Sequence, residues 1–432
     1  MKIFLAFYLT VLSLLFFNAC NTTEPPPVNE YSLNLKLEDV SCTEAWIQFS
    51  STNIQIPNNI SLFVNGNVKK TFTLNTKDSL LYIDSLLANQ TYKITATMQQ
   101  SNNASNELTL TTMDTTSHNF NWQTWTFGGQ AGSCALYDVA IIDENNIWAV
   151  GEIYMNDSLG NPDPIAYNAI YWNGREWKVK KIAVTYNGNQ TIAPLKGIFV
   201  LPSGEIIFSS GLPYLPQGNG WKLYHLWDMG VLDQNDGSVD RIWGTSLNDL
   251  YFAGSKGTIV HYGGSLVGWT KIESGTTTNI NDAWGVFENG TSTVFCPVSS
   301  IFNPPQDKKI LKIVDGKVYS VSWSKDRILY SCWTNSNNFL YACGEGVYVY
   351  NFGTWEQITL PAITTNSVRG NDINDIFIDG DYGFIAHFNG KSWHIYSNNY
   401  LKGYSRLSFK GDIVAIAGNY QGKAIIEIGR RN

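Results

Sequence analysis

The sequence predicts an all-β protein in which a small sandwich precedes a β-propeller, and three observations support this fold class. Apolar and aromatic residues alternate with polar ones over the first quarter of the chain, as in half-buried strands. From residue 121 onward, a short apolar run ending in glycine recurs roughly every 40 residues, a spacing typical of propeller blades. The last copy of this repeat lacks a fourth strand, and a strand without neighbours precedes the first copy.

The composition favours an extracellular β-protein and excludes a nucleic-acid partner. A chain of 432 residues is too long for one ordinary domain. Charged residues make up 15% of the chain, below the usual share of about 25%, and Asn, Ser, Thr, Gly and aromatic residues take their place. The net charge of −7 leaves no basic stripe that could neutralise phosphates.

Residues 1–20 resemble a bacterial lipoprotein signal peptide. Lys2 provides the positive start, Ile3–Phe17 is apolar, and Ala19 is the small residue before Cys20. The apolar run is short for a membrane span, and an ordinary secretory signal cut nearby is the alternative.

The resemblance implies that Cys20 becomes the lipidated first residue of the mature protein. We therefore expect attachment through acyl chains to a membrane of the bacterial cell envelope, the outer membrane, facing either the periplasm or the exterior. Residues 21–30 have no hydrophobic pattern and predict a polar tether stiffened by proline.

Residues 31–114 predict a sandwich of several short strands. Ala45, Ile47 and Phe49 fall on one face of a strand. Leu86 stands six residues before Tyr92, after which the alternation is strict. This spacing resembles the tyrosine corner of fibronectin type III domains. The resemblance implies a spacer or a binding platform.

Residues 120–432 predict the propeller. The residues that mark corresponding positions of the repeat are Gly151, Gly211, Gly254, Pro297, Gly344, Gly380 and Gly418. One blade cannot bury both faces of its sheet, so stacked neighbours must repeat the same apolar residues at the same depth. The marks predict seven blades, with six or eight as alternatives, and the strand at 121–128 is expected to complete the last blade and close the ring. Segments such as "GTIVHYGG" and "GFIAHFNGKSW" resemble the blades of bacterial lipoprotein propellers.

The sequence carries no recognisable catalytic, metal or cofactor pattern. H-E-x-x-H, G-x-S-x-G, paired cysteines and phosphate loops are missing, so no cofactor and no metal are predicted. His261 and His387 share a repeat position and are expected to be scaffold residues. Cys332 and Cys343 could face each other across a hairpin, or could be two buried thiols.

Charged residues cluster where the innermost strands are expected to begin. They are Asp138, Asp240, Asp282, Lys196, Arg241 and Arg369. These strand starts surround one mouth of the central channel of a propeller. The cluster could bind a ligand, or its members could be ion pairs and turn caps that hold the blades in register.

The lengthened intervals of the repeat suggest a binding face. Residues 152–168 and 212–221 are expected to be loops between second and third strands on neighbouring blades, and function concentrates on such loops. The candidate ligand-binding residues are Tyr154, Asp157, Asp163, Tyr167, Tyr214 and Trp221. They could recognise a glycan or an extended peptide, or the loops could simply pack against each other.

Taken together, these features favour a lipid-anchored envelope protein with a non-catalytic binding or scaffold role. The expected partners are the membrane and a glycan, peptide or envelope protein on one face of the propeller. A polysaccharide hydrolase or lyase with its site at the channel mouth is the alternative. The sequence does not predict an oligomeric state.

Overall fold

The computed structural model describes residues 31–98, 104–300, 307–323, 325–396 and 399–432. The predicted signal peptide, the lipidation site Cys20 and the tether lie outside the described residues. Among the described residues, no helix has the length and apolar character that crossing a membrane requires.

The chain divides into two compact units. The described part of the first unit comprises residues 31–40, 45–84 and 91–111 apart from the gap at 99–103, and the second comprises 41–44, 85–90 and most of 112–432.

The first unit contains two antiparallel sheets. One has the order β1-β2-β5 and the other β4-β3-β6-β7. The bounds are β1 (Ser32–Val40), β2 (Ala45–Thr52), β3 (Asn58–Val64), β4 (Asn67–Leu74), β5 (Asp78–Ile83), β6 (Thr91–Met98) and β7 (Leu108–Thr111). Ile47 and Phe49 of β2 and Ile94 of β6 are fully buried, as the alternation of the sequence predicts.

The second unit contains seven four-stranded antiparallel sheets in its described residues, numbered here in chain order. Sheet 1 consists of β9 (Ala135–Asp143), β10 (Asn146–Ile153), β11 (Tyr167–Trp172) and β12 (Trp177–Lys180). Sheet 2 consists of β15 (Gly197–Val200), β16 (Ile206–Ser209), β17 (Pro213–Gln217) and β18 (Gly220–Leu223). Sheet 3 consists of β19 (Val239–Ser246), β20 (Asp249–Gly254), β21 (Ile259–Tyr262) and β22 (Trp269–Ile272). Sheets 4 and 5 consist of β23 (Trp284–Glu288), β24 (Thr291–Val298), β25 (Lys309–Val314) and β26 (Lys317–Val321); and β27 (Leu329–Trp333), β28 (Phe339–Gly344), β29 (Gly346–Asn351) and β30 (Thr354–Ile358). Sheets 6 and 7 consist of β31 (Thr365–Asp372), β32 (Asp375–Gly380), β33 (Phe384–Phe388) and β34 (Trp393–Ile395); and β35 (Lys402–Lys410), β36 (Ile413–Tyr420), β37 (Lys423–Arg431) and β8 (Phe120–Phe127).

Short elements lie in the connections. A two-stranded hairpin, β13 (Val184–Tyr186) and β14 (Asn189–Thr191), connects sheets 1 and 2. Single turns of helix, η1 (Ser255–Gly257), α1 (Gly264–Val267) and η2 (Asp381–Gly383), lie in the connections of sheets 3 and 6.

The second strand of each sheet is buried on both faces, which explains its unbroken apolar run. In β10, Ile147 and Ala149 pack toward sheet 7, whereas Trp148 and Val150 pack toward sheet 2. Side chains of a strand alternate between its faces, so a strand between two neighbours needs an apolar residue at every position.

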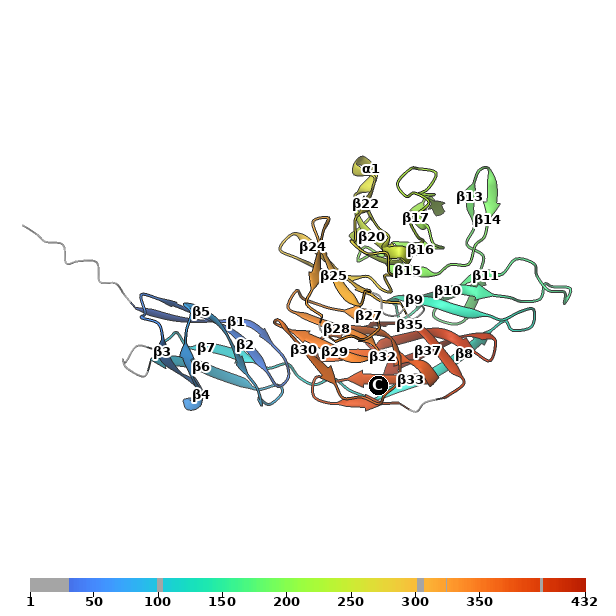
Figure 1. Ribbon diagram of the computed structural model, residues 1–432. Coiled ribbons are helices and arrows are strands. Elements are labelled where there is room, and N and C mark those ends of the chain that lie inside the picture. The colour runs from blue at the N-terminus through green and yellow to red at the C-terminus, as the bar shows by residue number, and fades with distance from the viewer. Residues whose placement is uncertain (1–30, 99–103, 301–306, 324, 397–398) are drawn as a thin grey trace, which may run out of the picture. The chain divides into compact units, whose positions relative to one another are not determined.

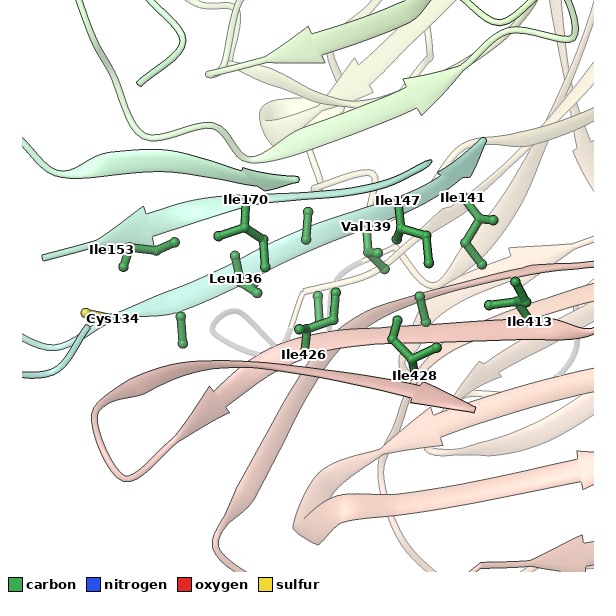
Figure 2. Packing of buried hydrophobic residues seen from close by; sticks show 14 residues of the cluster. Cys134, Leu136, Val139, Ile141, Ile147, Ile153, Ile170, Ile413, Ile426 and Ile428 are labelled. Carbon is green, nitrogen blue, oxygen red and sulfur yellow. The ribbon is translucent and has the colours of Figure 1, made fainter. Parts of the chain in front are cut away.

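The sheets form a closed ring. Seven core clusters within the described residues each join two consecutive sheets, and one of them joins sheet 7 back to sheet 1. Figure 2 shows this last junction, in which Val139 and Ile147 of sheet 1 face Ile426 and Ile428 of sheet 7. Radial packing of this kind removes the need for a single large core.

The strand β8 closes the ring by hydrogen bonding to the end of the chain. Its residues pair with β37 in continuous register from Phe127 with Ala424 to Phe120 with Arg431. Figure 1 shows β8 beside β37 although the two are far apart in sequence. The segment 121–128 is thus paired as the sequence predicts.

The repeated glycine has a physical cause that differs from a tight turn. A Cβ atom on Gly151 would lie 2.1 Å from the carbonyl oxygen of Ala135, and one on Gly254 would lie 2.0 Å from that of Ser238. The second strand therefore passes too close to the first for any side chain, and the ladder shifts register there. Other glycines do lie in tight turns, such as Gly353, which has a φ of 100°.

The hypothesis that Cys332 and Cys343 are bonded is wrong. In the hairpin Cys332 pairs with Ala342, and Cys343 pairs with Ser331. This offset by one position puts the two thiols on opposite faces of sheet 5, where both are buried and free.

Candidate functional site

The innermost strands line a central channel, and carboxylates on these strands lock neighbouring sheets together. Asp138 accepts a hydrogen bond from the Ile198 N–H of sheet 2 at 3.1 Å. Asp282 does the same for the Cys332 N–H of sheet 5 at 3.3 Å. Each carboxylate also accepts a bond from the N–H of the residue that follows it. For these two residues the structure shows the register-holding role that was the alternative to ligand binding.

Serine replaces aspartate at the same position in the next two sheets. The Ser331 hydroxyl accepts a bond from the Val368 N–H, and the Ser367 hydroxyl accepts one from the Leu407 N–H, each at 3.3 Å. A side-chain oxygen at this depth therefore bridges four junctions between described sheets.

Arg369 forms a buried ion pair in the channel. Its guanidinium donates to both carboxylate oxygens of Asp282, at 3.0 and 3.1 Å, and its centre lies 4.3 Å from the ring centroid of Trp284. Burial alone would raise the pKa of Asp282, but the Arg369 and Arg406 guanidinium groups outweigh it and hold this pKa far below its ordinary value. The pair is a structural crosslink between sheets 4 and 6.

Arg406 is a second structural cation in the channel, and the sequence interpretation missed it. From sheet 7 its guanidinium donates to the carbonyl oxygens of Asn366 at 2.6 Å and Tyr330 at 3.4 Å, and also to that of Asn281. It thereby spans the channel to sheets 4, 5 and 6. The sequence did contain a signal for this role. Arg406 directly precedes the aliphatic Leu407, just as the channel residues Asp138 and Arg241 directly precede Val139 and Ile242.

Arg241 differs from these two arginines. No hydrogen bond or ion pair within the described ranges engages its guanidinium. Burial and the nearby Arg406 charge lower the pKa of Arg241 to about 10, and the carboxylates of Asp138 and Asp282 offset only part of this effect. The guanidinium remains a cation whose donors are free for a ligand.

The channel mouth beside Arg241 is a cavity of about 630 Å³. Its lining includes Tyr137, Lys196, Asp240, Arg241, Tyr330 and Tyr404. The Oδ1 atom of Asp240 is buried there without a hydrogen-bond donor from the described residues. This mouth opens where the innermost strands begin, as the sequence predicted for Lys196, Asp240 and Arg241.

The predicted binding residues of the first loop are partly occupied by local contacts. The Tyr154 hydroxyl donates to the Glu152 carboxylate, and Asp157 accepts bonds from the N–H groups of Leu159 and Asn161 at 2.9 Å. The loop residues lie between β10 and β11, on the mouth side of the ring, because every connection from a second to a third strand emerges at that end.

The remaining two residues of that loop region, Asp163 and Tyr167, both contact Lys181. Asp163 accepts a bond from the Lys181 ammonium at 2.6 Å, and this contact lowers the pKa of Asp163. The same ammonium lies 4.7 Å from the ring centroid of Tyr167. These contacts tie the loop to the start of the next connection.

The prediction that residues 212–221 form a loop is wrong. Pro213–Gln217 is strand β17, and Trp221 pairs with Pro216 across the turn to β18. Tyr214 is 1% exposed and lies in the core with its hydroxyl accepting from Ser210, and the Trp221 indole N–H donates to the Ile206 carbonyl oxygen. Tyr214 and Trp221 therefore do not join Tyr154 and Tyr167 in one exposed aromatic surface.

The two repeated histidines are bonded in the same way. His261 bonds Asp249 at 2.9 Å and His387 bonds Asp375 at 2.8 Å, each pair spanning a second and a third strand. The identical geometry in sheets 3 and 6 indicates the scaffold role expected for a repeat position.

Asp379 is a buried carboxyl at a position where other sheets carry Ala253 or Ala417. Neither oxygen is in hydrogen-bonding geometry with a described residue, and the Arg406 and Arg369 charges offset only part of the burial effect. Burial raises the pKa of Asp379 to about 8, so the group is mostly protonated at neutral pH.

We expect Asp379→Ala to raise stability above about pH 5 and to flatten its pH dependence. In the folded wild-type protein the raised pKa of Asp379 favours its neutral form. The stability that this neutral form contributes is therefore complete below about pH 4 and is lost as the pH rises toward 8. Urea midpoints at pH 5 and pH 8 measure this slope. The exposed Glu356→Ala should keep the wild-type slope, and an unchanged slope in Asp379→Ala would contradict the assignment.

Among the residues described, no group of three or more His, Cys, Asp and Glu side chains is placed to hold a metal ion.

Comparisons with known proteins concern the fold. No protein-family model matches the chain, and no curated protein matches it. The structure titled as YCF48 bound to D1 peptide is similar at a TM-score of 0.48 and 13% identity, over 74% of this chain and 97% of that one. The structure of the WD40 repeats of RRP9 is similar at a TM-score of 0.49 and 6% identity, over 72% of this chain and 100% of that one. The structure of Raptor from Chaetomium thermophilum is similar at a TM-score of 0.50 and 10% identity, over 73% of this chain and 30% of that one. The second unit is a β-propeller, and these likenesses say nothing about its ligand.

Proposed function

We propose that this protein is a lipid-anchored lipoprotein of the bacterial cell envelope with a non-catalytic binding role. The partner binds the face of the propeller where the innermost strands begin. The observation that carries the proposal is the channel mouth, where the Arg241 guanidinium and one oxygen of the Asp240 carboxylate lack partners among the described residues.

The architecture of the proposal has three parts. The first unit is a fibronectin type III-like domain, supported by its three-plus-four strand order and by the spacing of Leu86 and Tyr92. The seven sheets counted in the described residues are the full set of blades. The signal-peptide pattern ending at Cys20 supplies the membrane anchor.

Extended connections emerge on the same face of the propeller as this mouth. Connections between second and third strands and those between sheets emerge at the same end, because the strands alternate in direction. The hairpin β13–β14 is one of them (Figure 1). The Tyr186 ring stacks on His225 at 4.7 Å between centroids, and its hydroxyl donates to Asp228 at 2.8 Å. The loop bearing Tyr154 and Asp163 adds a further part of the proposed rim.

Two of the channel carboxylates give the polysaccharide-acting alternative no support. Asp138 and Asp282 accept backbone N–H bonds, and Asp282 also pairs with Arg369, so neither carboxylate is placed as a free acid or base.

The test is binding of the mature chain to a peptide library and a glycan array. We expect ligands that are lost when the hairpin 184–191 is replaced by a two-residue turn. Shortening the turn that contains α1, which emerges at the opposite end, is the matched control and should leave binding intact. Equal binding by both variants, or polysaccharide turnover by the wild-type chain, would overturn the proposal.

A further inference from the structure

The channel contains two kinds of arginine. Arg369 and Arg406 donate hydrogen bonds to acceptors of the protein itself, and these bonds connect different sheets of the ring. Arg241 lies at the boundary between the mouth and the cavity at the other end of the channel, since it lines both. Its planar fork of donors engages none of the described residues.

The mouth also offers a complementary acceptor. Asp240, adjacent to Arg241 in sequence, accepts a hydrogen bond from the Ser238 hydroxyl through Oδ2 at 3.3 Å, whereas its Oδ1 atom is buried and has no donor among the described residues. A buried polar atom without a partner costs free energy, and a ligand donor would recover it. The exposed Lys196 on the same lining adds a second positive charge.

We propose that the channel mouth binds a carboxylate that has an N–H donor beside it, the chemistry shared by a polypeptide C-terminus and an N-acylated amino acid. The carboxylate pairs with the Arg241 fork, and the N–H donates to Asp240. This inference rests on the proposed function, because it names the ligand class of the same mouth.

The charges of the mouth favour a carboxylate over a phosphate. The lining contains three cations, Lys196, Arg241 and Arg406, and two carboxylates, Asp240 and Asp381, so a single negative charge is enough to balance it. A guanidinium matches a planar carboxylate with two parallel bonds. The rings of Tyr137, Tyr330 and Tyr404 surround the space that a ligand side chain would occupy.

The shape of the site favours a terminal group. The cavity of about 630 Å³ falls within the usual range of small-ligand pockets. Behind it, Arg406 reaches from sheet 7 to carbonyl oxygens of sheets 5 and 6 and lines both cavities, so its side chain narrows the channel between them. A chain end can enter such a narrowing mouth, whereas the middle of a chain would have to fold back on itself.

The experiment is calorimetric titration of the mature protein with acetyl-alanine, acetyl-trialanine and the C-terminal amide of each. We expect the free acids to bind and the amides to bind roughly ten-fold or more weakly, because amidation removes the charge that pairs with Arg241. Arg241→Gln should reduce acid binding by a similar factor. Lys410→Gln is the matched control, since Lys410 lines the opposite cavity. Its binding should match that of the wild type.

Several outcomes decide the proposal. Equal binding of acids and amides, no binding of either acid, or unchanged binding in Arg241→Gln would overturn it. Tighter binding of the tripeptide supports a polypeptide end as the source, and equal binding of both acids supports a small metabolite. If Arg241→Gln does not fold, Arg241→Lys takes its place and should weaken binding while keeping the charge. If neither free acid binds, but the library or array gives a ligand whose binding requires the hairpin 184–191, this inference is refuted and the proposed function still stands.

Discussion

Replacing Arg369 with alanine is expected to destabilise the propeller by about 3–5 kcal/mol, because it removes the ion-pair partner of the buried Asp282 carboxylate. The side chains of Arg369 and Asp282 are 12% and 3% exposed, so water cannot replace the lost partner. Asp282 also accepts the Cys332 N–H, and the unpaired charge would weaken the junction between sheets 4 and 5 as well. Urea denaturation at pH 7 gives the change in the free energy of unfolding.

Lys178→Ala is the matched control for this variant. Lys178 pairs with Glu176 at 3.2 Å, but the two side chains are 52% and 64% exposed. Exposed pairs contribute about 0–1 kcal/mol. If Arg369→Ala were as mild as Lys178→Ala, the channel pair would have no role in holding the sheets.

Replacing Phe120 with alanine is expected to cost about 3–5 kcal/mol, the range for a buried aromatic residue reduced to alanine. Phe120 is the first residue of β8 and is 7% exposed. Its ring lies 5.0 Å from that of Phe377 in an edge-on arrangement, and the Arg431 guanidinium lies 5.0 Å from its centroid. The truncation would leave a cavity between sheets 6 and 7 at the closing strand.

Tyr319→Ala provides the comparison, because Tyr319 is 52% exposed on the outer strand β26. A change of roughly 0.5 kcal/mol or less is expected there. Thermal unfolding of the two variants compares their losses of stability. A Phe120→Ala protein as stable as the wild type would show that β8 is not anchored at its first residue.

Much of the propeller could be predicted from the sequence because its repeat is dictated by local geometry. A second strand buried on both faces requires an apolar run such as that of β10, and the close approach at Gly151 excludes side chains. Both constraints act on neighbouring strands and therefore leave a pattern in the sequence. The pairing of β8 with β37 followed from counting strands.

The errors have equally local causes. The prediction of a loop at 212–221 rested on a lengthened interval of the repeat, but the structure forms strand β17 there, which contains Pro213 and Pro216 although proline is rare in strands. The hairpin β13–β14 was missed although Asn187 and Gly188 form a strong turn signal, with φ values of 48° and 78°.

The candidate site was only half visible in the sequence. Lys196, Asp240 and Arg241 were expected at the mouth, but no sequence pattern could show that Asp282 is satisfied by Arg369 while Arg241 is not. That distinction depends on which side chains meet across the channel from different sheets, and those contacts have no fixed spacing along the chain.

Hydrogen exchange of the backbone amides measures the closed ring most directly. In the wild-type chain, β8 (Phe120–Phe127) forms a continuous ladder with β37, so we predict that its hydrogen-bonded amides are protected to the same degree as those of Lys423–Arg431. Rapid exchange throughout 120–127, in a protein whose other sheets are protected, would contradict a ring closed by this strand.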